Sequence, residues 1–313
     1  MVTNNPQQIP QLKGLADTDL RLLRIFKAVV EAGGFAAAEV GLNISRAAIS
    51  MAISDLETRL KLRLCIRGRA GFSMTQEGEE VYQSALQLFT AIESFRTDVN
   101  SLHNELHGEF NIGITDNLVT MPHMHITNSL GQLKKQGPQV QINISMMPSK
   151  RIEQSILDGY LHAGVVTNSH RLPELEYLPL YSERSLLYCS EDHTLFGLDL
   201  KSTDIRKIAT YDAIAPAYAQ SAEIKRHYQK LNTTATATDR EGIAFLILTG
   251  AYIGYLPEHF AQQWVNQHRM RPLLPQHYQF DTDFSVITRK GRRQHSILNY
   301  WLKSLKSNNP SSK

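Results

Sequence analysis

The segment NISRAAISMAISDLE, residues 43–57, combines three serines with alanines and isoleucines, and it decides how the N-terminal part of the chain is interpreted. Ser45 is a favourable N-cap residue for a helix that begins directly after it. Ile49, Ile53 and Leu56 recur at helical spacing and form a stripe suited to burial. The segment is therefore predicted to be an amphipathic helix, and the open question is what its polar face contacts.

Two helical segments precede it. Apolar residues at helical spacing run from 19 to 30, the glycine pair 33–34 ends them, and a short helix is predicted over 35–40. Residues 41–43 then form a tight turn. Two helices joined by a short glycine-containing turn are typical of a helix-turn-helix. An ordinary helical bundle would give the same pattern and stays as the alternative.

The segment KLRLCIRGRAGFSMT, residues 61–75, has short β-like pieces around two glycines, as a small wing would. Between residues 45 and 70 lie six basic and two acidic residues, an excess larger than the formal charge of +3 on the whole chain. A charge run alone is more often a solvated face. Beside a helix-turn-helix, however, a local positive field indicates phosphate contact.

A long helix is predicted over 76–107. Its apolar residues alternate at spacings of four and three, which is the pattern of a coiled-coil seam, and no proline or glycine interrupts it after Glu79. Such a helix is expected to pair with the same helix of a second chain and form a dimer; the alternative is a helix that lies on its own domain. The seam residues are Val81, Ala85, Leu88, Ile92, Phe95, Val99, Leu102 and Leu106.

From Gly108 the pattern becomes α/β, with alternating strands and helices that predict parallel sheets with right-handed crossovers. Two lobes of similar size are expected, with Thr167 and Asn168 at the first crossover and residues 254–259 at the return. Predicted strands are 110–114, 140–146, 161–166, 185–189, 207–211, 233–238, 252–256, 270–274 and 284–288; predicted helices are 119–135, 148–159, 219–231, 241–249 and 293–306.

The predicted organisation has four parts. Residues 1–18 form a flexible arm, 19–75 a winged helix-turn-helix domain, 76–107 the linker helix and 108–306 the two-lobed α/β domain. Lobe I takes residues 108–166 and 268–306, and lobe II takes residues 167–267.

On its motifs the chain resembles the LysR-type transcriptional regulators. That family has Phe, Ala-Ala, Leu, Ser-Gln-Pro-Ala-Val-Ser and Leu-Glu in order, followed by Leu-Phe-x-Arg and Leu-Thr-x-x-Gly. The corresponding residues are Phe35, Ala37-Ala38, Leu42, SRAAIS at 45–50, Leu56-Glu57, LCIR at 64–67 and MTQEG at 74–78. The resemblance covers nearly the whole chain. It implies an α/β fold with an all-α N-terminal part, in which a winged helix-turn-helix and linker helix precede a domain like the periplasmic binding proteins.

The resemblance also implies that residues of the third helix and the wing bind DNA: Ser45, Arg46, Ala47, Ser50, Met51, Arg67 and Arg69. Arg46 departs from the glutamine of the family. Arginine can form two hydrogen bonds to guanine, whereas glutamine prefers adenine, so the operator could differ at that base pair. A phosphate contact by Arg46 is an equally good interpretation. Ala47, Met51, Cys65 and His162 also depart from the family pattern.

The resemblance implies that a small effector binds between the lobes, and polar residues that follow parallel strands are the candidates for binding it. Thr115, Asp116 and Asn117 follow the first strand, and Thr238 and Asp239 do the same in the second lobe. Helix N-termini favour anions, whereas Asp116 favours a ligand that also has an amine. The competing interpretation is that these residues are only N-caps. The effector-binding candidates are Thr115, Asp116, Asn117, Ser149, Thr167, Thr238 and Asp239.

Composition narrows the function classes. Two cysteines suit a reducing cytosol, the N-terminus has no signal peptide, and no run is long enough to span a membrane. No phosphate-loop, hydrolase or zinc-protease motif is present, so no enzyme, metal or cofactor is expected. The predicted protein is cytoplasmic, and its partners are double-stranded DNA, an amino-acid-like or small acid effector, itself as dimer or tetramer, and RNA polymerase.

Three hypotheses compete. The first is a DNA-binding regulator controlled by a metabolite. The second is a binding protein or enzyme with an incidental helical appendage, and the third is an architectural DNA-binding protein whose cleft has no ligand. A gel shift against DNA next to its own gene tests the second, and a thermal-shift screen separates the first from the third.

Overall fold

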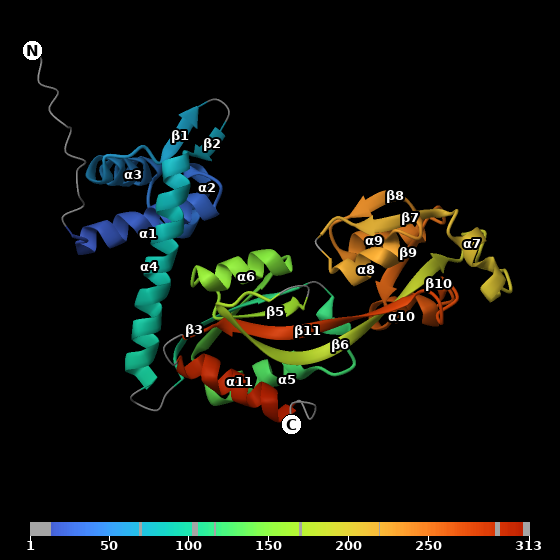
Figure 1. The fold of residues 1–313 in the computed structure, drawn as a ribbon. Coiled ribbons are helices and arrows are strands. Elements are labelled where there is room, and N and C mark those ends of the chain that lie inside the picture. The colour runs from blue at the N-terminus through green and yellow to red at the C-terminus, as the bar shows by residue number, and fades with distance from the viewer. Residues whose placement is uncertain are drawn as a thin grey trace, which may run out of the picture. The chain divides into compact units, whose positions relative to one another are not determined.

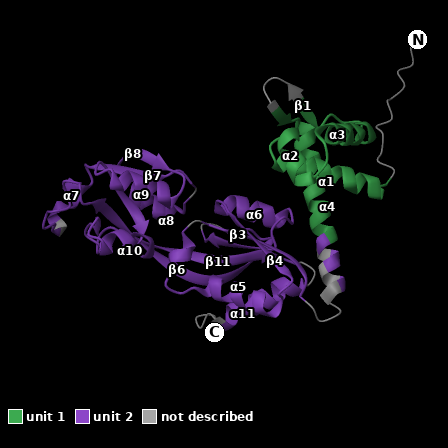
Figure 2. Ribbon diagram, turned by 180° about the vertical axis from the view of Figure 1, so that it is seen from behind, with its two compact units in different colours: residues 1–92 green, residues 93–313 purple. Residues whose placement is uncertain are grey.

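The computed structural model describes residues 14–68, 71–101, 106–115, 117–168, 171–218, 220–291 and 295–308. The chain divides into two compact units, residues 1–92 and 93–313, which are coloured separately in Figure 2. The boundary falls inside helix α4, Gln76–Ser101.

The N-terminal unit is a winged helix-turn-helix. Helices α1 (Asp17–Glu31), α2 (Phe35–Leu42) and α3 (Arg46–Leu60) precede strands β1 (Cys65–Gly68) and β2 (Gly71–Met74), which pair antiparallel (Figure 1). The predicted helices over 19–30, 35–40 and from Ser45 are confirmed. The turn between α2 and α3 is built on Asn43, whose φ of 53° is left-handed.

A few polar side chains outside the apolar core hold the helices and the wing of this unit in place. The carboxylate of Glu57 accepts hydrogen bonds from the backbone N–H groups of Leu64 (2.8 Å) and Cys65 (3.1 Å), which fixes the start of the wing. The Thr75 hydroxyl accepts from the N–H of Gly78 (2.9 Å) and caps α4. A Cβ on Gly78 would lie 2.1 Å from the carbonyl oxygen of Leu64, so this position requires glycine.

The two halves of α4 differ. In the first half Ala85 is buried in the core of the N-terminal unit, and Val81 and Leu88 pack against that core, so this part of the seam lies on its own domain. In the second half Phe95 is 68% exposed and Val99 is 41% exposed. The first half therefore packs on its own domain, and the pairing between chains stays a prediction for the second half of the helix.

The C-terminal unit has two three-layer lobes that share a single nine-stranded sheet, with order β4-β3-β5-β11-β6-β9-β7-β8 and β10 paired to β6. In lobe I, helices α5 and α11 cover one face of the sheet and α6 covers the other (Figure 1). Strands β3–β5 are parallel. The elements of lobe I are β3 (Gly108–Ile114), η1 (Leu118–Thr120), α5 (His125–Gln136), β4 (Val140–Met146), α6 (Ser149–Leu157), β5 (Ala163–Thr167) and α11 (Ser296–Asn308).

Lobe II repeats this layering. Helices α7 and α8 pack on one face of its sheet and α9 and α10 on the other, and β7 is parallel to both β8 and β9. Its elements are η2 (Ser202–Asp204), α7 (Ile205–Ile208), β7 (Asp212–Pro216), α8 (Ala222–Tyr228), β8 (Asn232–Ala237), α9 (Arg240–Leu248), β9 (Ile253–Pro257), α10 (Glu258–Asn266) and β10 (Met270–Pro272).

Two long antiparallel strands, β6 (Leu175–Ser190) and β11 (Gln279–Arg289), run from one lobe to the other. The expected crossovers at Thr167–Asn168 and 254–259 are therefore wrong: Thr167 ends β5, and 254–259 belong to β9 and α10. The lobe boundaries shift accordingly. Leu180, on β6, packs in the core of lobe I, and Met270 packs in lobe II.

Two predicted elements differ from the structure, and one helix was not predicted. The helix over 119–135 begins only at His125, because Pro122 lacks an N–H group and disfavours a helical residue before it. Residues 207–211 contain the end of α7 rather than a strand, and the strand starts at Asp212. Helix α10 was not predicted, because Pro257 directly follows the predicted strand 252–256 and proline commonly ends an element, whereas here it occupies the N-cap position.

Both cysteines are buried, as expected for small apolar residues. Burial raises the pKa of Cys189 to about 12, so its thiol stays protonated and weakly reactive near neutral pH. No helix in the described part of the chain is both long and apolar enough to cross a membrane.

Candidate functional site

The start of α3 is fixed by two side chains. The hydroxyl of Ser45 accepts a hydrogen bond from the N–H of Ala48 (3.3 Å), which makes Ser45 the N-cap as predicted. The carboxylate of Glu39, on α2, accepts from the N–H of Arg46 (3.0 Å). Two of the free N–H groups of the first turn are thereby satisfied, and the angle between α2 and α3 is held.

The outer face of α3 carries the predicted DNA-contacting residues. Arg46 and Ala47 are exposed, Ser50 is half-buried and Met51 is 68% exposed. The opposite face is fully buried, with Ile49, Ile53 and Leu56 at 0%. The Arg67 side chain and Arg69 lie outside the described residues. The exposed surface at the N-terminal end of α3 therefore includes both polar and apolar side chains.

Arg59 contributes less to the positive field than the residue count indicated. Its guanidinium forms an ion pair with Asp19 of α1, in which Nη2 donates to Oδ2 at 3.0 Å. The hydrogen bond from Arg59, and next that from the N–H of Ala16, lower the pKa of Asp19. Arg59 thus joins α1 to α3, and its charge is largely offset.

In the C-terminal unit a cavity of about 490 Å³ lies between the lobes. All the predicted effector-binding residues that the structure describes line it, and they come from both lobes. They are Thr115, Asn117, Ser149, Thr167, Thr238 and Asp239; Asp116 lies outside the described residues.

Several of these residues have a different local role from the predicted one. Thr115 and Asn117 precede the 3-10 turn η1 rather than an α-helix, and Asn117 has a left-handed φ of 63°. Ser149 is the first residue of α6, not its cap, and its hydroxyl accepts from the N–H of Thr167 at 3.3 Å. Asp239 is a true N-cap, because its carboxylate accepts from the N–H of Gly242 at 2.7 Å.

The two helices that begin at the cavity differ at their N-termini. Helix α6 of lobe I starts after Pro148 and has no side-chain cap, so the positive end of its helix dipole and the exposed Lys150 offer a positive site. Helix α9 of lobe II is capped by Asp239, and Glu241 follows in its first turn. Glu153, 2% exposed, adds a third carboxylate to the cavity wall.

The cavity wall includes the buried side chain of Thr115. The hydroxyl oxygen of Thr115 is buried and forms no hydrogen bond among the described residues, while Thr115 itself is 5% exposed. A buried hydroxyl without a partner is destabilising by about 1–3 kcal/mol, so a ligand that forms a hydrogen bond to it would remove this penalty and bind more tightly.

A smaller chamber of about 180 Å³ adjoins this cavity and shares Thr167, Tyr218 and Arg240 with it. Tyr228 and Tyr255 line its inner wall with ring centroids 5.2 Å apart. Burial raises the pKa of both phenols well above the usual range, so both stay neutral.

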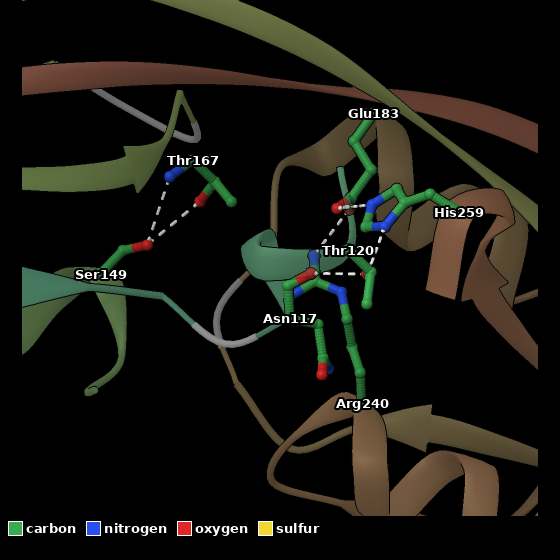
Figure 3. A network of polar contacts seen from close by, with 7 residues as sticks. All are labelled: Asn117, Thr120, Ser149, Thr167, Glu183, Arg240 and His259. Carbon is green, nitrogen blue, oxygen red and sulfur yellow. Dashed lines mark hydrogen bonds and ion pairs between the residues drawn. The ribbon is translucent and has the colours of Figure 1, made fainter. Parts of the chain in front are cut away.

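Beneath the cavity wall lies a buried carboxylate that contacts two side chains of lobe II, one of which also contacts lobe I (Figure 3). Glu183, on β6, has a side chain with 0% exposure; Arg240 Nη2 donates to its Oε1 at 2.9 Å, and His259 Nε2 contacts its Oε2 at 2.9 Å. His259 Nδ1 lies 2.7 Å from the hydroxyl of Thr120 in lobe I. That hydroxyl also lies 3.1 Å from the carbonyl oxygen of Asn117.

Sequence reasoning did not find this network. Arg240 directly follows the predicted Thr238-Asp239 pair, and that adjacency was the only signal. Glu183 stands among residues of a strand pattern, and His259 lies in the helix that was missed. Their proximity depends on pairing between β6 and β9, which the linear pattern does not specify.

The fold and the cavity define a helix-turn-helix regulator with a two-lobed ligand-binding domain. Residues 20–79 match the family described as bacterial regulatory helix-turn-helix protein, lysR family, and residues 103–309 match the LysR substrate binding domain. The chain belongs to the LysR family of transcriptional regulators. It is a sequence-specific DNA-binding protein with an effector-binding domain, and the predicted family is confirmed.

Named relatives agree with this assignment. The chain is 51% identical over 296 residues to the HTH-type transcriptional activator BauR of Pseudomonas aeruginosa, covering 95% of this chain and 97% of the relative. It is 32% identical over 182 residues to the SDS degradation transcriptional activation protein of a Pseudomonas species, covering 57% of this chain and 58% of that protein.

Solved structures share the fold. CbnR, a LysR family transcriptional regulator, superposes with a TM-score of 0.68 at 18% identity, covering 94% of this chain and 99% of that one. Full-length CbnR complexed with its target DNA gives 0.66 at 19% identity, covering 93% and 99%. The predicted fold class is confirmed.

Proposed function

We propose that the cavity binds a small zwitterion, a compound with one carboxylate and one ammonium group, and that this ligand controls DNA binding. The observation that carries the proposal is the difference between the two helix N-termini at the cavity. The uncapped start of α6, with Lys150, suits the carboxylate. The acidic first turn of α9, with Asp239 and Glu241, suits the ammonium group.

Charge pairing supports a zwitterion over a simple acid or amine. Arg240 also lines the cavity, but its guanidinium is already paired with Glu183, which leaves Lys150 as the cation facing the ligand among the described lining residues. The carboxylates of Glu153, Asp239 and Glu241 outnumber it. A simple anion would face this negative excess without compensation, whereas a zwitterion satisfies both signs.

A ligand that contacts α6 of lobe I and α9 of lobe II binds most tightly when the lobes hold both ends at once. Binding therefore shifts the equilibrium toward the lobe arrangement that the ligand prefers. The size of the shift is set by the difference in the ligand's affinity for the two arrangements. We infer that this shift passes to DNA affinity or DNA bending. Thr115, Asn117, Ser149, Thr167, Thr238 and Asp239 are the proposed ligand-contacting residues, together with Asp116.

The test is isothermal titration calorimetry of the full-length protein with glycine, β-alanine and 4-aminobutyrate, which differ in the spacing between their charges. Propionate and propylamine are matched controls with only one charge. We expect at least one amino acid to bind and neither control to bind comparably. Lys150→Gln and Glu241→Gln should each weaken binding about fivefold, since each removes one exposed charge contact worth about 1 kcal/mol.

Lys303→Gln is the control variant, because Lys303 is exposed on α11 and does not line the cavity. Binding of propionate as tight as that of the amino acids would contradict the zwitterion. Unchanged affinity in both cavity variants would show that the ligand sits elsewhere.

On the DNA side we propose that Ser45, Arg46, Ala47, Ser50 and Met51 face the major groove and that Arg67 and Arg69 of the wing contact the backbone. The exposed front of α3 supports this assignment. We also propose that α4 pairs between chains through Phe95 and Val99, so that a dimer reads two half-sites in the cytoplasm.

We further propose that the protein activates transcription and contacts RNA polymerase, acting by binding rather than catalysis. The similarity to a transcriptional activator over almost the entire chain supports this direction of regulation. Transcription in vitro from the promoter next to its own gene tests it. An increase in transcript with protein and ligand is expected, and a decrease would indicate a repressor.

A further inference from the structure

We infer that Glu183 is a positioning residue for the effector cavity and the centre of a latch between the lobes, which runs from Arg240 through Glu183 and His259 to Thr120. The inference rests on the proposed ligand-binding role of the cavity and names how that site is regulated. Figure 3 shows these side chains with Asn117, whose carbonyl oxygen ends the chain of contacts.

The burial of Glu183 makes the latch a single unit. Its side chain is fully shielded from water, and each carboxylate oxygen has one nitrogen partner at 2.9 Å. A buried carboxylate that loses one partner keeps its full desolvation penalty. Loss of either contact therefore leaves the other contact to compensate the buried charge alone. The exposures of Arg240 (9%) and His259 (8%) show that water has little access to replace them.

One end of the latch is at the ligand. Arg240 is the first residue of α9 and lines both the cavity and the adjoining chamber, and its guanidinium direction is set by Glu183. Removal of the Glu183 charge would leave the Arg240 guanidinium at the cavity without this carboxylate. The cavity would then carry more positive charge and would favour an anionic ligand over a zwitterion.

The other end crosses between lobes. Thr120 belongs to η1 in lobe I, and η1 directly follows the segment that places Thr115 and Asn117 in the cavity wall. His259 belongs to α10 in lobe II. A change in the ligand-contacting loop therefore acts on the same hydrogen bond that joins the lobes.

The Thr120 hydroxyl can be oriented in two different ways. The Thr120 hydroxyl has one proton, which it donates either to the carbonyl of Asn117 or to Nδ1 of His259. In the first arrangement the hydroxyl oxygen accepts from Nδ1 of His259, so Thr120 keeps both of its contacts. In the second arrangement the contact with Asn117 is lost.

The latch is tested without any ligand by measuring the distance between the lobes. Spin labels at Lys135→Cys on α5 and Lys225→Cys on α8 are exposed sites, one in each lobe, and the two native cysteines are buried. Double electron–electron resonance on full-length protein, mixed with excess unlabelled chain, reports the distance within one protomer.

We expect one narrow distance distribution in the otherwise unaltered protein and a broader one in both Thr120→Val and Glu183→Gln. Thr120→Val keeps the side-chain shape at an exposed position and so tests the latch even if Glu183→Gln fails to fold. Thr210→Val is the matched control, because its hydroxyl donates to the carbonyl oxygen of Lys207 within lobe II, and it should leave the distribution unchanged. A wild-type distribution in Thr120→Val would overturn the latch.

Calorimetry with whichever of glycine, β-alanine and 4-aminobutyrate binds the unaltered protein most tightly then tests the link to the cavity. About fivefold weaker binding is expected in Thr120→Val, and no change in Thr210→Val, since couplings between sites are commonly of this size. If no amino acid binds the unaltered protein, the zwitterion proposal fails while the distance measurement still decides the latch. If amino acids bind and both latch variants retain the original affinity, Glu183 does not position the cavity.

Discussion

In the N-terminal unit Arg46, Ala47 and Met51 project outward from one helix whose inner face is completely buried, whereas in the C-terminal unit the cavity collects single side chains from several separate strands and helices. The first surface depends on one continuous segment and its core. The second depends on where two lobes stand relative to each other. Substitutions behind the DNA-binding surface should therefore affect folding, and those around the cavity should affect ligand binding and lobe arrangement.

The largest expected effect is that of Gly78→Ala. The new Cβ would meet the carbonyl oxygen of Leu64, which is backbone and cannot move aside, so the N-terminal unit should lose about 3 kcal/mol of stability. Both tryptophans, Trp264 and Trp301, lie in the C-terminal unit. Urea unfolding should therefore show an earlier transition in far-ultraviolet circular dichroism but not in tryptophan fluorescence.

Gly41→Ala is the matched control, since a Cβ there meets nothing within 4 Å in a helix where alanine is favoured by up to about 1 kcal/mol. A simultaneous shift of both signals in Gly78→Ala would show that the two units unfold together, which would break the comparison.

The next effect concerns Phe95, whose exposed ring is expected to be buried against a second chain. Phe95→Glu should weaken the dimer by about 2 kcal/mol for each ring, since that is the scale for burial of such a side chain. Sedimentation velocity over a dilution series measures the dissociation constant. Ser84→Glu, at an exposed site on the first half of α4, should leave it unchanged.

Arg46→Ala tests the outward surface itself. If Arg46 reads a guanine, the loss should be about 1–3 kcal/mol and confined to one base pair. Fluorescence anisotropy with operator variants measures it. Equal weakening on all sequences would assign Arg46 to phosphate contact instead. Arg59→Ala serves for comparison, because its ion pair with Asp19 predicts a loss of stability without a change in base preference.

The smallest effect is a dependence on pH. Because the pKa of Asp19 is lowered in the folded protein, chiefly by Arg59, its ion pair contributes stability above the unfolded pKa near 3.8, and this is lost as pH falls through the lower folded value. Asp19→Asn should thus be less stable than the parent at neutral pH, with the difference vanishing in acid. The transition measured by circular dichroism should show it, and an equal difference at every pH would contradict it.

The same comparison explains what could be predicted from the sequence. The helix-turn-helix was predictable because its signals are local: a cap at Ser45, an apolar stripe through Ile49 and Ile53, and a glycine-containing turn. The cavity residues were found because parallel strands direct their following loops to a common edge, which needs only strand order. The structure brings Thr115, Ser149 and Asp239 to one cavity on that basis.

The features that could not be predicted depend on contacts between residues far apart in the sequence, or on prolines in an unusual role. The crossing strands β6 and β11 pair over residues about a hundred positions apart, and no local pattern reveals that register. Pro122 shortened one predicted helix, and Pro257 began a helix that its usual breaking role concealed. The latch residues escaped notice because a buried ion pair between a strand and two helices is visible only in three dimensions.

Footprinting of the full-length protein with DNase I on the DNA next to its own gene, with and without the tightest-binding amino acid, tests most directly whether the cavity controls the DNA-binding surface. We expect the ligand to change the protected region or its hypersensitive positions. The change should require more ligand in Lys150→Gln, while the footprint without ligand stays the same. A footprint identical with and without a ligand that calorimetry shows to be bound would contradict effector control.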